Sequence, residues 1–126
     1  MRAVSRYMDE TVFVQALTIS LVFGIVVGAL TARSSHRREP IYGGVPAHIF
    51  HVAGAIAYAA VLPAVLSTLI LGGGFRTAAT LALTLVTTSL LTLMLFAVVE
   101  RPVRNQRLNQ RDESGWTEED ARTSGL

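Results

Sequence analysis

Three long stretches of this chain contain no Asp, Glu, Lys or Arg: residues 11–32, 41–75 and 77–99. A helix needs roughly 20 apolar residues to cross the hydrocarbon core of a bilayer, and each stretch is long enough. Inside lipid the backbone must satisfy its own hydrogen bonds, which a lone segment does as a helix. The sequence therefore predicts an all-α integral membrane protein with transmembrane helices at about 11–32, 47–71 and 77–99.

Composition supports this class. The 126 residues are 51% hydrophobic and only 16% charged, whereas soluble domains are usually about 25% charged. The longest polar segment, 101–126, is too short to fold alone, so we expect one transmembrane domain over 1–100 and a polar tail over 101–126. The chain has no Cys, which excludes disulfides, thiolate metal sites and thiol catalysis.

The basic residues are all Arg and flank the apolar segments, which indicates anchoring at lipid headgroups rather than a nucleic-acid surface. Exclusive use of Arg also favours a GC-rich, hence prokaryotic, genome. Arg is denser in 33–38 and 101–111 than in 1–10 and 72–76, so the N-terminus is expected outside and the tail in the cytoplasm. Gly72, Gly73 and Gly74 predict a tight turn that makes the second and third helices an antiparallel hairpin. The expected location is the plasma membrane, with several passes.

Small residues recur at every fourth position of the first apolar segment. Such a face lets helix backbones approach closely in lipid, and it contains a GxxxG pair. The face either docks a partner subunit or packs against the chain's own second or third helix. Its members are Ala16, Ser20, Gly24, Gly28 and Ala32.

Hydroxyl side chains follow one face of the third segment: Thr80, Thr84, Thr88 and Thr92. Threonine can bond the carbonyl one turn earlier or a neighbouring helix, so it is tolerated in lipid. We favour helix packing over a water-filled path because no acid, base or amide shares this face.

Pro63 lies inside the second segment and predicts a structural bend there.

His48 and His51 lie three residues apart at the start of the second helix and so share a face. They are candidates for a haem b or quinone site shared with another subunit. A haem held by this chain alone is disfavoured, because the other two helices carry no His and His36 is expected on a loop. Otherwise no cofactor or metal is expected.

The third helix is expected to end at Glu100-Arg101-Pro102, with Glu100 in a solvated ion pair with Arg101 or Arg104. In the tail, Trp116 beside Glu118 and Glu119 is a candidate anchor for a cytoplasmic subunit. The alternative for this Trp is an interfacial anchor at the headgroups.

No embedded acid or base, phosphate loop or nucleophile motif points to an enzyme or an independent ion carrier. The size and layout are similar to small subunits of respiratory complexes and to haem-anchor subunits of succinate dehydrogenase, whose His and Arg motifs are not evident here. The expected function is a non-catalytic accessory subunit of a larger prokaryotic membrane complex, with energy-transducing redox complexes as first candidates. Its partners would be other integral subunits, the lipid bilayer and a cytoplasmic subunit. The alternatives are a homo-oligomeric channel or small transporter, and the shared haem or quinone anchor.

Overall fold

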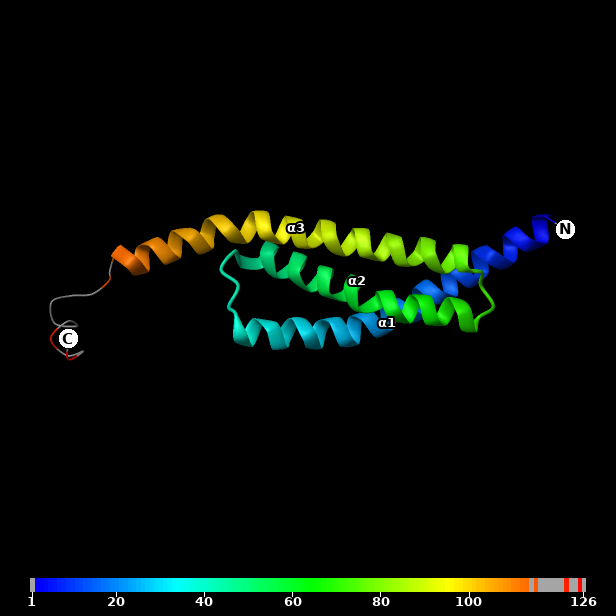
Figure 1. The fold of residues 1–126 in the computed structure, drawn as a ribbon, viewed down its shortest axis with the longest axis horizontal. Helices are drawn as coiled ribbons and strands as arrows, with labels where there is room; N and C mark the ends of the chain where they lie inside the picture. The colour runs from blue at the N-terminus through cyan, green and yellow to red at the C-terminus, as the bar shows by residue number, and fades with distance from the viewer. Residues whose placement is uncertain (1, 114, 116–121, 123–124, 126) are drawn as a thin grey trace.

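The computed structural model describes residues 2–113, 115, 122 and 125, and its main elements are three helices (Figure 1). They are α1 (Arg2–Arg38), α2 (Gly44–Ile70) and α3 (Phe75–Glu113). All three are long and apolar enough to cross a membrane, over Met8–Arg38, Gly44–Ile70 and Phe75–Arg111. The prediction of an all-helical protein with three potential membrane-spanning helices is therefore confirmed.

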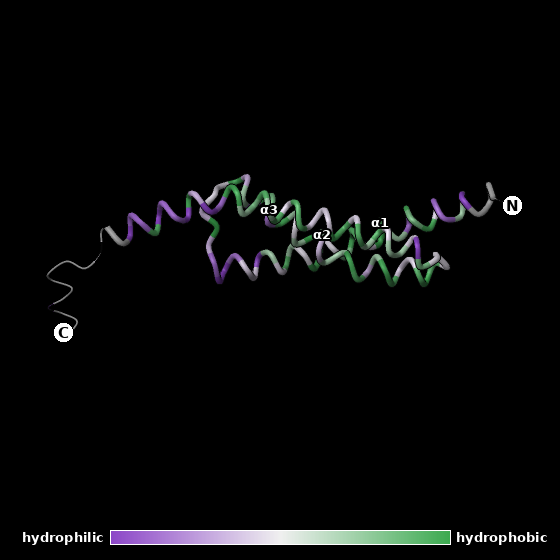
Figure 2. Tube along the Cα trace, turned by 45° about the horizontal axis from the view of Figure 1, so that its top comes forward, coloured by the Kyte–Doolittle hydropathy of each residue, from purple (hydrophilic) through white to green (hydrophobic). Residues whose placement is uncertain are grey.

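Large apolar side chains cover the outside of the helices. Leu62, Leu83 and Val98 are each about two-thirds exposed, and Tyr58 is 72% exposed. Figure 2 shows that apolar residues dominate the middle of each helix, whereas polar residues gather at the projecting ends of α1 and α3. So extensive an apolar surface is unfavourable in water and favourable against lipid, which agrees with the membrane assignment.

Helix α2 is the central element of the fold. It packs against α1 on one side and α3 on the other, whereas α1 and α3 scarcely meet. Small residues of α2 allow both neighbours to approach, and they contribute to a compact core that larger side chains complete. That core consists of Ala16, Ala60, Ala64, Leu81 and Leu85, with Phe13, Leu17 and Val61 packed against it.

Two short connections join the helices. The first, 39–43, begins at Glu39, whose N–H still donates to the Ser35 carbonyl. In the second, 71–74, backbone N–H groups form hydrogen bonds to carbonyls at the end of α2. The Gly73 N–H donates to the Thr68 carbonyl at 2.8 Å, and the Gly72 N–H donates to the Leu69 carbonyl at 3.1 Å. Gly72 has a φ of +79°, which glycine adopts without steric cost.

The outer ends of α1 and α3 differ from the sequence prediction. Helix α3 continues through Pro102 to Glu113 instead of ending at 99, and α1 covers 2–38 instead of 11–32. Charged residues mark where lipid ends, but Arg and Gln are good helix formers and do not end a helix. Pro102 lacks an N–H donor and crowds the preceding turn, and Figure 1 shows α3 changing direction near its yellow section.

Candidate functional site

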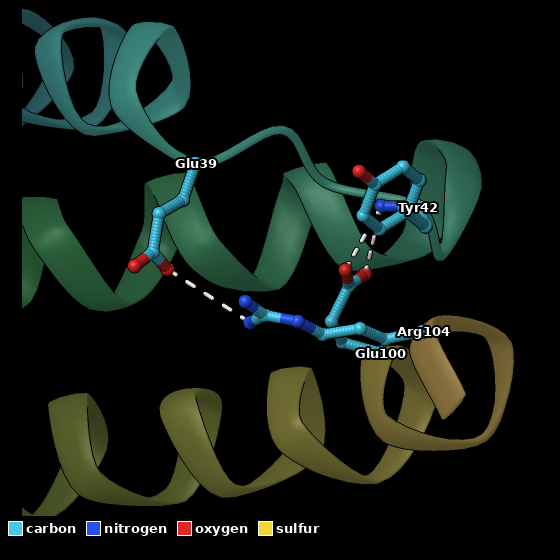
Figure 3. A network of polar contacts seen from close by, with 4 residues as sticks. All are labelled: Glu39, Tyr42, Glu100 and Arg104. Atoms are coloured by element: carbon cyan, nitrogen blue, oxygen red, sulfur yellow. Dashed lines mark hydrogen bonds and ion pairs between the residues drawn. The ribbon is translucent and has the colours of Figure 1, made fainter. Parts of the chain in front are cut away.

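The Glu100 side chain is the main polar feature at the end of the structure where 39–43 connects α1 to α2. It is 5% exposed, although it lies at the end of the apolar part of α3. Its Oε1 accepts a hydrogen bond from the Tyr42 N–H at 2.9 Å, and its Oε2 accepts from the Tyr42 N–H at 3.1 Å and the Gly43 N–H at 2.7 Å. Figure 3 shows the carboxylate directed at the backbone of the connection.

These contacts make Glu100 a cap supplied by another helix. Helix α2 begins at Gly44 and has no side-chain cap of its own at Gly43. The first N–H groups of a helix have no partner within it, and its N-terminus carries a partial positive charge. A carboxylate here therefore satisfies backbone donors just before α2 and interacts favourably with the helix dipole.

The expectation of a solvated ion pair at Glu100 is wrong. Arg104 instead lies 3.8 Å from Glu39, measured between Nη1 and Oε2, and both side chains are largely exposed (Figure 3). The Arg107 guanidinium lies over the Tyr42 ring, 5.4 Å from its centroid. The arginines thus contact the connection from outside, while the carboxylate holds it from within.

Gly43 is required for this arrangement. A Cβ on Gly43 would lie 2.7 Å from the Ala47 Cβ and 2.9 Å from the Glu100 Oε2. The next residue, Gly44, has a φ of +73°, which disfavours any residue with a side chain. The Gly43-Gly44 pair in the sequence indicates a tight connection before α2. It does not indicate Glu100 as the acceptor, because Glu100 lies 57 residues away from Gly43 in the chain.

The three histidines gather at the same end of the structure. His36 lies in the last turns of α1 and not on a loop, so that expectation is wrong. Its ring lies edge-on to His48, with centroids 4.7 Å apart, and the His51 ring lies 5.1 Å from that of Phe96. His48 Nδ1 is 2.9 Å from the Gly44 carbonyl oxygen. When Nδ1 donates to that carbonyl, Nε2 is the nitrogen left for a haem iron.

No metal centre is formed by the described part of the chain: it holds no group of three or more His, Asp or Glu side chains arranged for an ion. To hold a haem through Nε2, His48 would need a second axial ligand from elsewhere. His51 contributes packing against α3 through Phe96.

The small-residue face of α1 is buried against α2 of the same chain. A Cβ on Gly28 would lie 2.5 Å from the Ile56 Cα, and one on Gly24 would lie 2.7 Å from the Ile56 carbonyl oxygen. Of the two interpretations of this face, the structure shows packing within the chain. All five residues are buried: Ala16, Ser20, Gly24, Gly28 and Ala32.

The threonines of α3 each donate a hydrogen bond to the carbonyl four residues earlier, over 2.8–2.9 Å. Thr80, Thr84 and Thr88 are exposed, and Thr92 is half-buried. Among the described residues, a hydroxyl that joins α3 to α2 is that of Ser89, which donates to the Gly54 carbonyl at 3.0 Å and is buried. The sequence did not predict this role for Ser89, because Ser89 is one residue away from the repeat of Thr80, Thr84, Thr88 and Thr92.

The tail residues Trp116, Glu118 and Glu119 lie outside the described residues. Comparison with known proteins adds no assignment: no protein-family model, curated protein or solved structure matches this chain.

Proposed function

We propose that this protein is a non-catalytic accessory subunit of a larger prokaryotic membrane complex. Energy-transducing redox complexes, such as respiratory ones, are the first candidates. The proposed orientation places the N-terminus outside, the 39–43 connection and the end of α3 in the cytoplasm, and α2 and α3 as an antiparallel hairpin across the plasma membrane. Arg33, Arg37 and Arg38 support this orientation, because basic residues near helix ends favour the cytoplasm.

The observation that carries the proposal is the projecting end of α3. Residues 101–113 continue the helix beyond the apolar segment, for about 20 Å at 1.5 Å per residue. Arg104 and Arg107 contact Glu39 and Tyr42, so the base of this extension is held by the connection. A helix fixed at its base and exposed along its length suits docking of another subunit.

Glu100 supports a structural role over an ion-carrying one. Proton pathways through membranes usually depend on ionisable groups within the helices. The Glu100 carboxylate is instead engaged by the Tyr42 and Gly43 backbone. We infer that this carboxylate stabilises the fold. The tail around Trp116 is proposed as a further contact with a cytoplasmic subunit.

The first test is extraction in mild detergent through an N-terminal tag, followed by mass spectrometry of the co-purifying subunits. A stoichiometric set of other subunits is expected and would identify the chemistry of the complex. The matched variant is Gln106→Glu with Asn109→Glu, on the exposed side of the α3 extension. It should release the partners, whereas a control with Ser34→Glu and Ser35→Glu on α1 should retain them.

Gly24 and Gly28 are unsuitable for that test. Because both contact α2, replacing them with Leu would disturb the chain's own packing and would not report on a partner. If the α3 variant keeps a full set of subunits, the extension is not the docking site. A purified monomer with no other subunit contradicts the accessory role.

A second candidate function is a homo-oligomeric channel or small transporter. The exposed position of Thr80, Thr84 and Thr88 favours it, since several copies could bring these residues together. Native mass spectrometry of the purified protein tests this proposal. A ring of identical subunits would favour it, and a single copy among different subunits would contradict it.

A third candidate is a haem anchor shared with another subunit, favoured by the hydrogen bond between His48 and Gly44. The absorbance spectrum of the purified complex tests it. A haem band that His48→Ala abolishes and His51→Ala retains would identify the ligand, and a spectrum without a haem band contradicts the haem proposal.

A further inference from the structure

An open groove with a volume of about 550 Å³ lies between residues 6–14 of α1 and residues 76–80 of α3. It is at the opposite end of the structure from Glu100. Its apolar part includes Phe13 and Val14, and its charged part includes Arg6, Asp9, Glu10 and Arg76.

The helix arrangement explains the groove. Helix α2 ends at Ile70, and α1 passes the 71–74 turn at Val12, whose Cγ1 would be 2.9 Å from a Cβ on Gly73. The residues before Val12 therefore extend beyond that turn, as the N-terminal end of α1 does in Figure 1. Because α1 and α3 scarcely meet, the space between their first turns stays open.

The four charged side chains at the groove are exposed, and none of them forms an ion pair or a hydrogen bond with another described residue. Two are guanidinium groups and two are carboxylates. Helix α3 has no acidic residue in its first turn, so the positive end of its dipole adds to the positive charge of Arg76. The groove thus offers both signs of charge to one external ligand.

Depth in the membrane restricts the class of that ligand. Asp9 and Glu10 directly precede the charge-free segment that begins at Thr11, and Arg76 directly precedes the one that begins at Thr77. Charged residues at such boundaries lie at the level of lipid headgroups. Phe13 and Val14, one turn further along α1, lie where acyl chains begin.

We propose that this groove binds a zwitterionic phospholipid whose headgroup carries a primary ammonium group, such as phosphatidylethanolamine. The phosphate would lie against Arg6 and Arg76, since guanidinium groups bind phosphate through paired hydrogen bonds. The ammonium would donate to Asp9 and Glu10. An anionic glycerol headgroup offers only neutral hydroxyl donors to these carboxylates, and a choline headgroup has no N–H.

This inference goes beyond the proposed function, because it concerns the chain alone and needs no partner subunit. The full-length protein in detergent is titrated with phosphatidylethanolamine, phosphatidylcholine and phosphatidylglycerol that carry identical acyl chains. Native mass spectrometry then gives the affinity for each lipid. The expected result is that phosphatidylethanolamine binds about fivefold more tightly than either of the others, the effect of one exposed ion pair.

Two double variants test which side chains contact the ammonium and which contact the phosphate. Asp9→Asn with Glu10→Gln should abolish the preference for ethanolamine over glycerol, whereas Arg6→Gln with Arg76→Gln should lower the affinity for all three lipids. The matched control, Arg33→Gln with Arg37→Gln at the other end of the structure, should leave both quantities unchanged. Circular dichroism checks that each variant keeps its helices.

Equal affinity of the wild type for the three lipids overturns the proposal, and so does tighter binding of phosphatidylglycerol. A preference for phosphatidylethanolamine that both groove variants retain also overturns it. The wild-type titration decides the question even where a variant fails to fold.

Discussion

The two ends of the helix arrangement use charge in opposite ways. At one end the Glu100 carboxylate is buried and held by backbone N–H groups, and Arg104 pairs with Glu39. At the other end Arg6 and Arg76 face an open groove together with two carboxylates. A charge near a membrane boundary can therefore hold the fold together or remain available to a ligand, and its sequence position alone does not distinguish the two.

The connections explain this difference. The 71–74 turn satisfies its own donors, since the Gly72 and Gly73 N–H groups bond to carbonyls at the end of α2. The 39–43 connection leaves the Tyr42 and Gly43 N–H groups directed at α3, where an acceptor is needed. A buried donor left without a partner costs about 1–3 kcal/mol, so one end requires a carboxylate and the other does not.

The largest expected effect on stability comes from Glu100→Gln. This change removes the charge and one acceptor, and it places an amide NH₂ against backbone donors. We expect the free energy of unfolding to fall by about 2–4 kcal/mol, measured by reversible unfolding in mixed micelles. The matched control is Glu39→Gln, where the side chain is 74% exposed and the change should cost under about 0.5 kcal/mol. Equal effects of the two changes would mean that Glu100 is not a cap.

A second comparison makes the same substitution in each connection. Gly43→Ala places a methyl group against Ala47 and Glu100, so it should destabilise by about 1–3 kcal/mol through overpacking. Gly74→Ala meets nothing within 4 Å and should change stability by less than about 0.5 kcal/mol. The readout is the unfolding midpoint of each variant in the same micelles. If Gly43→Ala leaves the unfolding midpoint unchanged, the 39–43 connection is loosely packed.

The membrane segments follow from the sequence because lipid imposes a strict rule on charge. The helix predicted at 47–71 agrees with α2 within three residues at each end, and the helix predicted at 77–99 agrees with the start of α3 within two. The ends of α1 and α3 outside the lipid do not follow from that rule. There, the helix propensity of the residues and the connections decide where a helix ends, and α3 continues through Pro102 to Glu113.

The candidate sites were less predictable, because they depend on which surfaces meet. The spacing of Gly24 and Gly28 predicts a close helix contact but not its partner, which is Ile56 of α2. Glu100 is adjacent to Arg101 in sequence, and nothing local reveals that Tyr42 and Gly43 are its donors. The groove between α1 and α3 depends on how these two helices flank α2 with little contact between them, which no local pattern encodes.

A smaller effect is expected between the two ends, where hydroxyl groups face either another helix or the outside. Ser89→Ala removes the hydrogen bond to the Gly54 carbonyl and should cost about 0.6 kcal/mol and at most about 1.7 kcal/mol, the average and the maximum for such bonds between membrane helices. Thr84→Ala removes only a bond within α3 and should cost less. Unfolding free energies in the same micelles compare them. A larger loss for Thr84 than for Ser89 would mean that the exposed face of α3 is packed in the folded protein.

The smallest effect is expected for the exposed ion pair beside Glu100. Arg104 and Glu39 are 48% and 74% exposed and 3.8 Å apart, so solvent screens their attraction. A double-mutant cycle with Arg104→Gln and Glu39→Gln should give a coupling energy of at most about 0.5 kcal/mol. Such a value would assign the stability of this end to the buried carboxylate. A coupling above about 1 kcal/mol would instead mean that the outer arginine contacts share in holding the connection, and that Glu100 does not act alone.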